Sequence, residues 1–290
     1  MTTQNVAADL HIHTTASDGT ATVSERVTQA RKKGLDAIAI TDHESISSSL
    51  ASRRDVRDNV EVITGVEIRA DLLGSKVEIL GYYVDPDDES LLAVLNRIQR
   101  YREERNEKIM ENLSATTGIE ISKSTVPTPR GSLGRPHLAD YLVEQGVVSS
   151  VQKAFDYYLA DDAECFVPMR RVDYDEVIEA VQNAGGVASL AHPGYIQADS
   201  VGLEEIVKRL ADAGLDAIEG KYPYEETDGR GGKFSYLTAK KFAESHELLL
   251  TGGTDCHGPD SGKFRIGSEG ISSDLLESIR ECADRRRSFT

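Results

Sequence analysis

The feature that most limits the fold of this chain is a regular alternation of short apolar runs and amphipathic helical patterns. Apolar runs of this length, rich in β-branched residues, indicate buried strands. Strands are expected at residues 7–13, 37–43, 60–68, 77–84, 187–192, 217–222 and 248–255. Helices are expected at residues 23–33, 47–58, 90–115, 174–184, 203–213, 234–245 and 274–286. Repeated strand–helix units predict an α/β fold with a parallel sheet covered by helices, either a barrel or an open sheet.

The pattern changes after Pro86, where a helical region interrupts the alternation. The helix expected at residues 90–115 has a strongly charged middle, and shorter helices are expected across residues 136–160. We therefore expect a small helical subdomain inserted into the main domain. The expected parts are the main domain, residues 1–86 and 168–290, and the inserted lid subdomain, residues 87–167.

The charge balance is strongly acidic, with 49 Asp and Glu against 33 Lys and Arg and a formal net charge of -16. A field of this sign repels long nucleic acid and anionic membranes. An anionic substrate must then be captured locally, which favours a small phosphorylated nucleotide or a short oligonucleotide as the partner.

Cysteine use and hydropathy bound the cellular setting. The three cysteines are widely spaced and form no CxxC pair, so a reducing cytoplasm is expected. No apolar stretch reaches the length of about 18 residues needed to cross a membrane, and no basic-then-apolar leader opens the sequence. We expect a cytoplasmic protein without a membrane partner.

Side chains of the kinds that bind metals lie at or just after the C-terminal ends of the expected strands. In α/β folds these ends meet at one edge, where sites form. His11 and His13 are two residues apart, as are Asp255 and His257, so in extended backbone each pair points to the same side. The predicted metal ligands are His11, His13, Asp18, His43, Glu67, His192, Asp255 and His257.

Each of these segments, taken alone, also has an ordinary structural explanation. The HxH pair could be core histidines, Asp18 could form a turn, and His43 could follow a helix cap. Their joint placement at one edge of one sheet favours a metal site instead. Imidazole and carboxylate ligands without thiolates suit manganese, with zinc or iron as alternatives.

Five segments, in this order, resemble the polymerase and histidinol phosphatase (PHP) family. They are residues 9–19 (DLHIHTTASDG), 41–45 (TDHES), 65–68 (GVEI), 191–194 (AHPG) and 253–258 (GTDCHG). The resemblance covers essentially the whole chain. It implies a distorted (β/α)7 barrel that holds two or three divalent metal ions at its mouth. The glycine-arginine-proline-histidine segment at residues 134–137 is similar to the branch that acts on 3′,5′-bisphosphonucleotides or short RNA.

The resemblance also implies how the metal ligands divide among three ions. His11, His13, Glu67 and Asp255 would hold the first ion. Glu67 would bridge to a second ion, together with His192 and the residue at position 78. The third ion would be held by Asp18, His43 and His257. Many relatives have histidine at position 78, whereas this chain has Glu78, which either ligates with added negative charge or faces solvent.

The chemistry expected of such a site is hydrolysis of a phosphate ester by hydroxide that the metal ions activate. Asp42, next to His43, would orient a ligand or the water, while His192 or His257 would protonate the leaving group. Basic residues near the site would grip phosphate. The candidates for substrate binding are Arg135, His137, Lys221, Lys263 and Arg265.

Four functions remain open at this stage. The first is a phosphatase for a small nucleotide such as a 3′,5′-bisphosphonucleotide. A 5′-to-3′ exoribonuclease acting on short RNA uses the same chemistry, as does a histidinol-phosphatase-like enzyme. A non-catalytic metal-binding module is disfavoured because the full ligand set is present.

Overall fold

The structure is a computed structural model that describes residues 6–127, 133–197, 202–224, 234–258 and 265–287. Contacts divide the chain into two compact units. The first consists of Met1–Leu95 and Val172–Thr290, and the second of Asn96–Arg171. The expected insertion, residues 87–167, overlaps the second unit, and its role as a lid stays a prediction.

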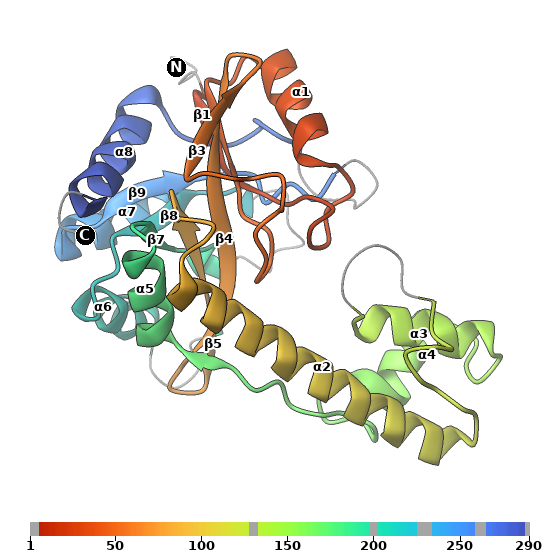
Figure 1. The fold of residues 1–290 in the computed structure, drawn as a ribbon. Coiled ribbons are helices and arrows are strands. Elements are labelled where there is room, and N and C mark those ends of the chain that lie inside the picture. The colour runs from red at the N-terminus through yellow and green to blue at the C-terminus, as the bar shows by residue number, and fades with distance from the viewer. Residues whose placement is uncertain (1–5, 128–132, 198–201, 225–233, 259–264, 288–290) are drawn as a thin grey trace. The chain divides into compact units, whose positions relative to one another are not determined.

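The first unit is built on a nine-stranded mixed sheet (Figure 1). The strands are β1 (Ala8–Ile12), β2 (Ala37–Ile40), β3 (Arg54–Arg57), β4 (Val60–Leu72), β5 (Ser75–Tyr82), β6 (Val172–Asp173), β7 (Val187–Leu190), β8 (Ala217–Lys221) and β9 (Leu249–Gly252). The order along the main path is β1-β2-β4-β5-β7-β8-β9, and β3 and β6 each pair with β4. Neighbours β1, β2 and β4 run parallel, as do β7, β8 and β9.

Strand β5 runs antiparallel to both of its neighbours, which differs from the expected all-parallel sheet. The cause is a tight hairpin between β4 and β5. Leu73 and Gly74 have φ angles of 52° and 86°, which gives the left-handed turn that joins two antiparallel strands. Strand β4 consequently extends to Leu72, beyond the expected end at residue 68.

The helix expected at residues 47–58 is wrong. Residues 54–57 instead form β3, which pairs antiparallel with β4 from Val60 to Ile63. Asp58 and Asn59 make the turn, with φ angles of 50° and 64°. Aspartate and asparagine tolerate this left-handed conformation, and the serines that precede them are weak helix formers.

The helices of the first unit mostly follow the expected pattern. They are α1 (Val23–Lys33), α5 (Tyr174–Asn183), α6 (Leu203–Asp212), α7 (Tyr236–His246) and α8 (Ser273–Arg287). Sequence signals define both ends of α1. Thr22 and Glu25 form a capping box at its start, and Gly34 ends it in a left-handed conformation with a φ of 74°.

The apolar faces of these elements form the core of the first unit. One side is filled by α1 against Ile12 of β1 and against Ile38 and Ile40 of β2. Another cluster joins Leu80 and Tyr82 of β5 to Ile279 of α8. The strands that carry the predicted metal ligands are therefore buried and packed against helices.

The second unit is helical. Its elements are α2 (Glu89–Thr117), which begins in the first unit, α3 (Arg135–Glu144), α4 (Val151–Ala154) and the π-helical turn η1 (Phe155–Leu159). Ile109 and Leu113 of α2 belong to the same buried cluster as Leu138 and Leu142 of α3. The second unit thus has a hydrophobic core of its own.

The segment after β9 returns to β1. Cys256 forms a parallel bridge with Ile12, and the His13 N–H donates to the Cys256 carbonyl over 3.0 Å. Gly253 makes this approach possible, because a Cβ there would lie 2.3 Å from the backbone nitrogen of His11. The first and last motifs of the chain are thereby brought side by side. Among the described residues, no helix is long and apolar enough to cross a membrane.

Candidate metal centre

The first group of ligands joins the end of β1 to the segment after β9. His11 Nε2 lies 3.5 Å from Asp255 Oδ1, and His13 Nε2 lies 3.1 Å from the same oxygen. Glu67 Oε2 lies 3.5 Å from His11 Nε2 and 3.4 Å from His13 Nε2. The three residues His11, His13 and Asp255 offer ligand atoms within 4.8 Å of one another.

The second group centres on Glu67 of β4. Its Oε1 lies 2.9 Å from Nε2 of His192, which follows β7 and precedes the short 3₁₀ helix η2 (Pro193–Tyr195). Glu78 of β5 contacts the same ring nitrogen, with its Oε2 3.4 Å from His192 Nε2. His11, Glu67 and His192 form one candidate metal group, and His43, Glu67 and Glu78 form another. Glu67 is therefore placed to bridge two ions.

The third group lies at the outer edge of the site. Asp18 Oδ1 is 3.2 Å from His257 Nε2 and 3.6 Å from His13 Nδ1. Its Oδ2 is 3.7 Å from His43 Nε2. Asp18 is the exposed member of this set, whereas His13 and His257 are buried. The structure thus brings together the eight predicted ligands and Glu78, the residue whose role was left open.

Unsatisfied buried atoms show that the residues fit metal ions. The ring nitrogens of His13, Nε2 of His11, Nδ1 of His43 and Oε2 of Glu67 are buried and make no hydrogen bond to any residue that the structure describes. Burying such atoms without a partner costs free energy. Some of these atoms lie close to one another; His43 Nδ1, for example, is 2.9 Å from Glu67 Oε2. Their geometry nevertheless does not form a hydrogen bond. Atoms arranged in this way would be satisfied by shared cations.

The acid–base properties follow from burial and from the mixture of charges. Burial alone would lower the pKa of His11, but the carboxylates of Glu219, Glu67 and Asp255 outweigh it and raise that pKa. The opposite holds for His13, where burial and the neighbouring His43 lower the pKa to about 3. A pKa this low keeps the His13 imidazole neutral, which is the form that binds metal.

The carboxylates respond in the same environment. Burial would raise the pKa of Glu67, yet His43 and His11 hold it well below the usual value. Glu78 is also buried, and its pKa is lowered to about 2 because His192, Arg69 and Lys76 outweigh burial and the repulsion from Glu67. Both side chains are thus ionised at neutral pH, as metal ligands must be.

The structure adds a residue that the sequence reasoning missed. Glu219 of β8 is fully buried, and its Oε1 lies 3.1 Å from His11 Nδ1. Its Oε2 accepts a hydrogen bond of 2.7 Å from the backbone N–H of His192. A glutamate between Ile218 and Gly220 of an expected buried strand was the available signal, because a buried carboxylate needs partners.

Asp9, at the start of the first motif, is a second missed residue. Its carboxylate accepts hydrogen bonds from the backbone of Thr254 and Gly267 and from the Thr254 hydroxyl. Burial raises the pKa of Asp9 to about 6. Asp9 fixes the segment that carries Asp255 against β1.

Asp42, which was expected to orient a ligand or the water, contacts the loop that carries Asp18. Its carboxylate accepts hydrogen bonds from the Thr14 backbone and hydroxyl, at 2.7 and 2.6 Å, and from the Ser17 hydroxyl at 2.6 Å. Asp42 therefore holds the loop that carries Asp18. These contacts make it a positioning residue and do not support direct action on substrate.

The predicted phosphate-binding residues are less well supported. The Lys221 ammonium lies 5.3 Å from the ring centroid of Tyr236 of α7. A direct role of Lys221 in substrate binding stays a prediction. Arg265 is exposed, and Lys263 lies outside the described residues.

Arg135 and His137 belong to the second unit, at the start of α3. Arg135 donates to the Leu159 carbonyl over 2.9 Å and pairs with Asp161 at 2.8 Å. The His137 Nδ1 atom accepts a hydrogen bond from the Gly134 N–H. Both residues thus contribute to the local structure of this unit, and their contact with substrate stays a prediction.

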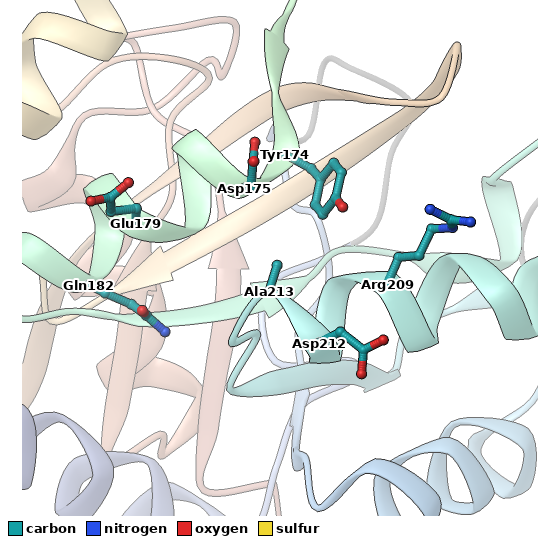
Figure 2. Close-up of a pocket in the computed structure, with 7 residues that line it drawn as sticks. All are labelled: Tyr174, Asp175, Glu179, Gln182, Arg209, Asp212 and Ala213. Carbon is teal, nitrogen blue, oxygen red and sulfur yellow. The ribbon is translucent and has the colours of Figure 1, made fainter.

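A surface hollow of about 560 Å³ lies between α5 and α6 (Figure 2). Asp175 and Glu179 of α5 line it, together with Arg209 and Asp212 of α6. None of the predicted metal ligands lines this hollow, so it is separate from the metal centre.

Comparison with known proteins agrees with the site. The PHP domain model matches residues 9–212. The chain is 30% identical over 258 residues to the 5′-3′ exoribonuclease Rnm of Escherichia coli (strain K12), covering 88% of this chain and 86% of the relative. It is 27% identical over 267 residues to the 3′,5′-nucleoside bisphosphate phosphatase of Chromobacterium violaceum, covering 89% and 90%. A crystal structure from Bifidobacterium adolescentis, assigned as a metal-dependent phosphoesterase, has a TM-score of 0.73 at 29% identity and covers 95% and 96% of the two chains.

The chain belongs to the PHP domain family. It is a metal-dependent phosphoesterase, a hydrolase that acts on phosphate ester bonds. The resemblance and the enzyme class drawn from the sequence are confirmed, whereas the physiological ester and the metal are not identified by these similarities.

Proposed function

We propose that this enzyme hydrolyses the phosphate monoester of a small nucleotide, with a 3′,5′-bisphosphonucleotide as the preferred substrate. The observation that carries the proposal is the set of overlapping ligand groups that share Glu67. Their buried, unsatisfied nitrogen and oxygen atoms suit two or three divalent cations, and manganese fits the mixed imidazole and carboxylate ligands best. When bound, such cations activate water for attack on phosphorus and neutralise the phosphoryl oxygens.

The protein's own contribution is to hold the ligand atoms in register. Glu219 binds His11 and the backbone of His192, and Asp42 fixes the loop of Asp18. Contacts of this kind orient the ligands and maintain their affinity for metal. His11, His13 and Glu67 are also almost completely buried, which limits the access of bulk water to these side chains.

The two candidate proton donors differ in their contacts. His257 Nδ1 lies 2.8 Å from the Asp255 carbonyl oxygen, so this nitrogen donates and Nε2 is left as the ligand atom. His192 instead places Nε2 between Glu67 and Glu78. Burial would lower the pKa of His192, but these carboxylates raise it. We assign His257 to metal binding; His192, whose Nε2 also belongs to a candidate metal group, can act as the acid for the leaving group only while that nitrogen is not bound to metal.

An aromatic cluster beside the metal ligands supports a nucleotide as the substrate. The rings of Tyr195 and His192 lie 5.6 Å apart between centroids, and Tyr195 lies 5.6 Å from Tyr224. Tyr195 and Tyr224 are half-buried, whereas Tyr222 is buried and donates to Asp255 Oδ2. Half-buried tyrosines next to a phosphate site can stack a base.

The proposal has two further parts, a closed barrel and a lid. The bridge between Ile12 and Cys256 links the two ends of the sheet path, as closure into a distorted (β/α)7 barrel requires. The second unit, with Arg135 and His137, would act as the inserted lid and grip the substrate's other phosphate.

The second candidate is 5′-to-3′ exoribonuclease activity on short RNA, which the similarity to Rnm favours. The test offers a 3′,5′-bisphosphonucleotide and a short 5′-phosphorylated RNA side by side to the manganese-loaded protein. The proposal predicts a higher kcat/KM for the bisphosphonucleotide. A higher kcat/KM for the RNA would instead favour the second candidate. If the His11→Ala/His13→Ala variant kept both activities, the metal site would be rejected.

A further inference from the structure

Arg69 lies next to the metal ligands although no motif includes it. It follows Glu67 by two residues on β4, so both side chains leave the same face of the strand. In the β4–β5 hairpin Arg69 is paired with Glu78. The hairpin thus places a guanidinium beside the carboxylate that faces His192.

Glu78 links Arg69 to the ligand set. Its Oε1 accepts a hydrogen bond of 2.7 Å from Arg69 Nε, and Lys76 Nζ lies 3.1 Å from the same oxygen. Its Oε2 points to His192 Nε2 at 3.4 Å. Arg69 therefore contacts one candidate metal ligand directly and faces the others across its carboxylate.

The donors of Arg69 are only partly used. Its Nε binds Glu78 and its backbone nitrogen contacts Glu44 Oε1 at 3.4 Å. Within the part of the chain that the structure describes, the two terminal nitrogens have no hydrogen-bond partner. The side chain is 35% exposed, so a ligand can reach these nitrogens. A guanidinium fixed at Nε presents its remaining donors as a preformed fork for phosphate.

Lys76 makes this assignment more specific. Its ammonium already offsets the charge of Glu78 on the same oxygen. Charge compensation alone would therefore not require Arg69, whose planar fork has the geometry that a phosphoryl group needs.

We propose that Arg69 binds a phosphoryl oxygen of the substrate at the edge of the metal centre and that Glu78 positions its guanidinium. This inference rests on the proposed function and names a binding residue that the ligand motifs do not contain. The ligand class is a phosphate monoester dianion or its product, inorganic phosphate.

The test measures binding of inorganic phosphate by calorimetry to the manganese-loaded protein and to its Arg69→Gln variant. Loss of a charge-assisted hydrogen bond predicts a Kd increase of about tenfold or more, while bound manganese, measured by elemental analysis, stays the same. Lys76→Gln is the matched control, since it removes the other cation on the same carboxylate oxygen and should change the Kd by less than about twofold. An unchanged Kd in Arg69→Gln would overturn the proposal.

A double variant separates phosphate binding from compensation of Glu78. If Arg69 served only to neutralise Glu78, Arg69→Gln/Glu78→Gln would restore phosphate affinity and refute the inference. Because Glu78 belongs to a candidate metal group, the reference is the Glu78→Gln single variant with its bound manganese measured, and a Kd that rises further in the double variant supports the inference. If Arg69→Gln fails to fold, phosphate binding is measured with Arg69→Lys, which keeps the positive charge but lacks the planar guanidinium. We expect its Kd to lie between that of the wild-type protein and the value predicted for Arg69→Gln. Should the wild-type protein hydrolyse no phosphate monoester, the proposed function would fail, yet the phosphate-binding result would still decide the role of Arg69.

Discussion

The Oε1 atom of Glu219 lies 3.1 Å from Nδ1 of His11, inside the sheet and away from solvent. The other oxygen of Glu219 accepts the backbone N–H of His192, 2.7 Å away. One carboxylate on β8 therefore orients ligands that come from β1 and from the end of β7. A histidine that donates one ring nitrogen in this way keeps the other available for metal.

Replacement of Glu219 by glutamine should weaken metal binding without unfolding the protein. The amide keeps the size of the side chain but cannot accept from both His11 and His192 at once. We expect metal affinity and kcat/KM to fall by about 10- to 100-fold, measured by competition with a chelator dye and by ester hydrolysis. Glu244→Gln on the exposed side of α7 is the control, and equal metal affinity in both variants would contradict the orienting role of Glu219.

Removal of both imidazoles at the end of β1 should abolish metal-stimulated activity. Combined His11→Ala and His13→Ala substitutions remove ligands from three of the four candidate metal groups. The expected result is a fall in kcat/KM of roughly a thousandfold or more, together with fewer bound ions per chain. His246→Ala on α7 serves as the control for histidine substitution. Full activity of the double variant in a folded protein would reject the metal site.

The metal-free and metal-loaded proteins should respond differently to pH. In the metal-free protein, nearby carboxylates outweigh burial and raise the pKa values of His11, His43 and His192. The stability that these histidines contribute is present below their unfolded pKa of about 6.5 and is lost as pH rises through the folded values. Metal binding requires neutral imidazole and strengthens with rising pH.

We therefore expect the difference in Tm between the two forms to widen from about pH 6 to about pH 8.5. Scanning calorimetry with manganese or with a chelator measures it. In the metal-free protein, the stability that Glu67 contributes has the opposite dependence on pH. Its pKa is held below the usual value, so its contribution is present above about pH 4.5 and is lost on acidification. A Tm difference that narrows with rising pH would contradict this electrostatic account.

Arg135→Ala should affect both the stability of the second unit and the KM for the nucleotide. Its guanidinium binds the Leu159 carbonyl and Asp161 and lies about 6 Å from the ring centroids of Phe155 and Phe166. Asp161→Asn separates the two effects, because it removes an exposed ion pair worth less than about 1 kcal/mol but leaves Arg135 in place. We expect a raised KM only in Arg135→Ala; an unchanged KM there would remove Arg135 from the phosphate pocket.

Local signals in the sequence were sufficient for much of the fold. The N-cap residue Thr22 and the terminal glycine Gly34 define α1, and both bounds of that helix were predicted. The histidines and carboxylates at strand ends were expected to share one edge, and the structure brings them together. Such signals depend only on neighbours in the chain.

The errors arose where pairing between strands decides the structure. The turn residues Asp58 and Asn59 form a hairpin signal, but residues 47–58 were interpreted as a helix. The turn at Leu73 and Gly74 sets the register that places Arg69 opposite Glu78. Glu219 was missed because its partner His11 is 208 residues away along the chain. The polarity of a single residue in an apolar strand does not reveal such a partner.

The central claim is that the scattered imidazoles and carboxylates share metal ions. Anomalous diffraction at the manganese edge, from crystals of the wild-type protein grown with manganese, tests it most directly. The account predicts two or three anomalous peaks, each within about 2.5 Å of ligand atoms, with Glu67 contacting two of them. Ions bound only elsewhere, or no peak between His13, Glu67 and Asp255, would contradict it.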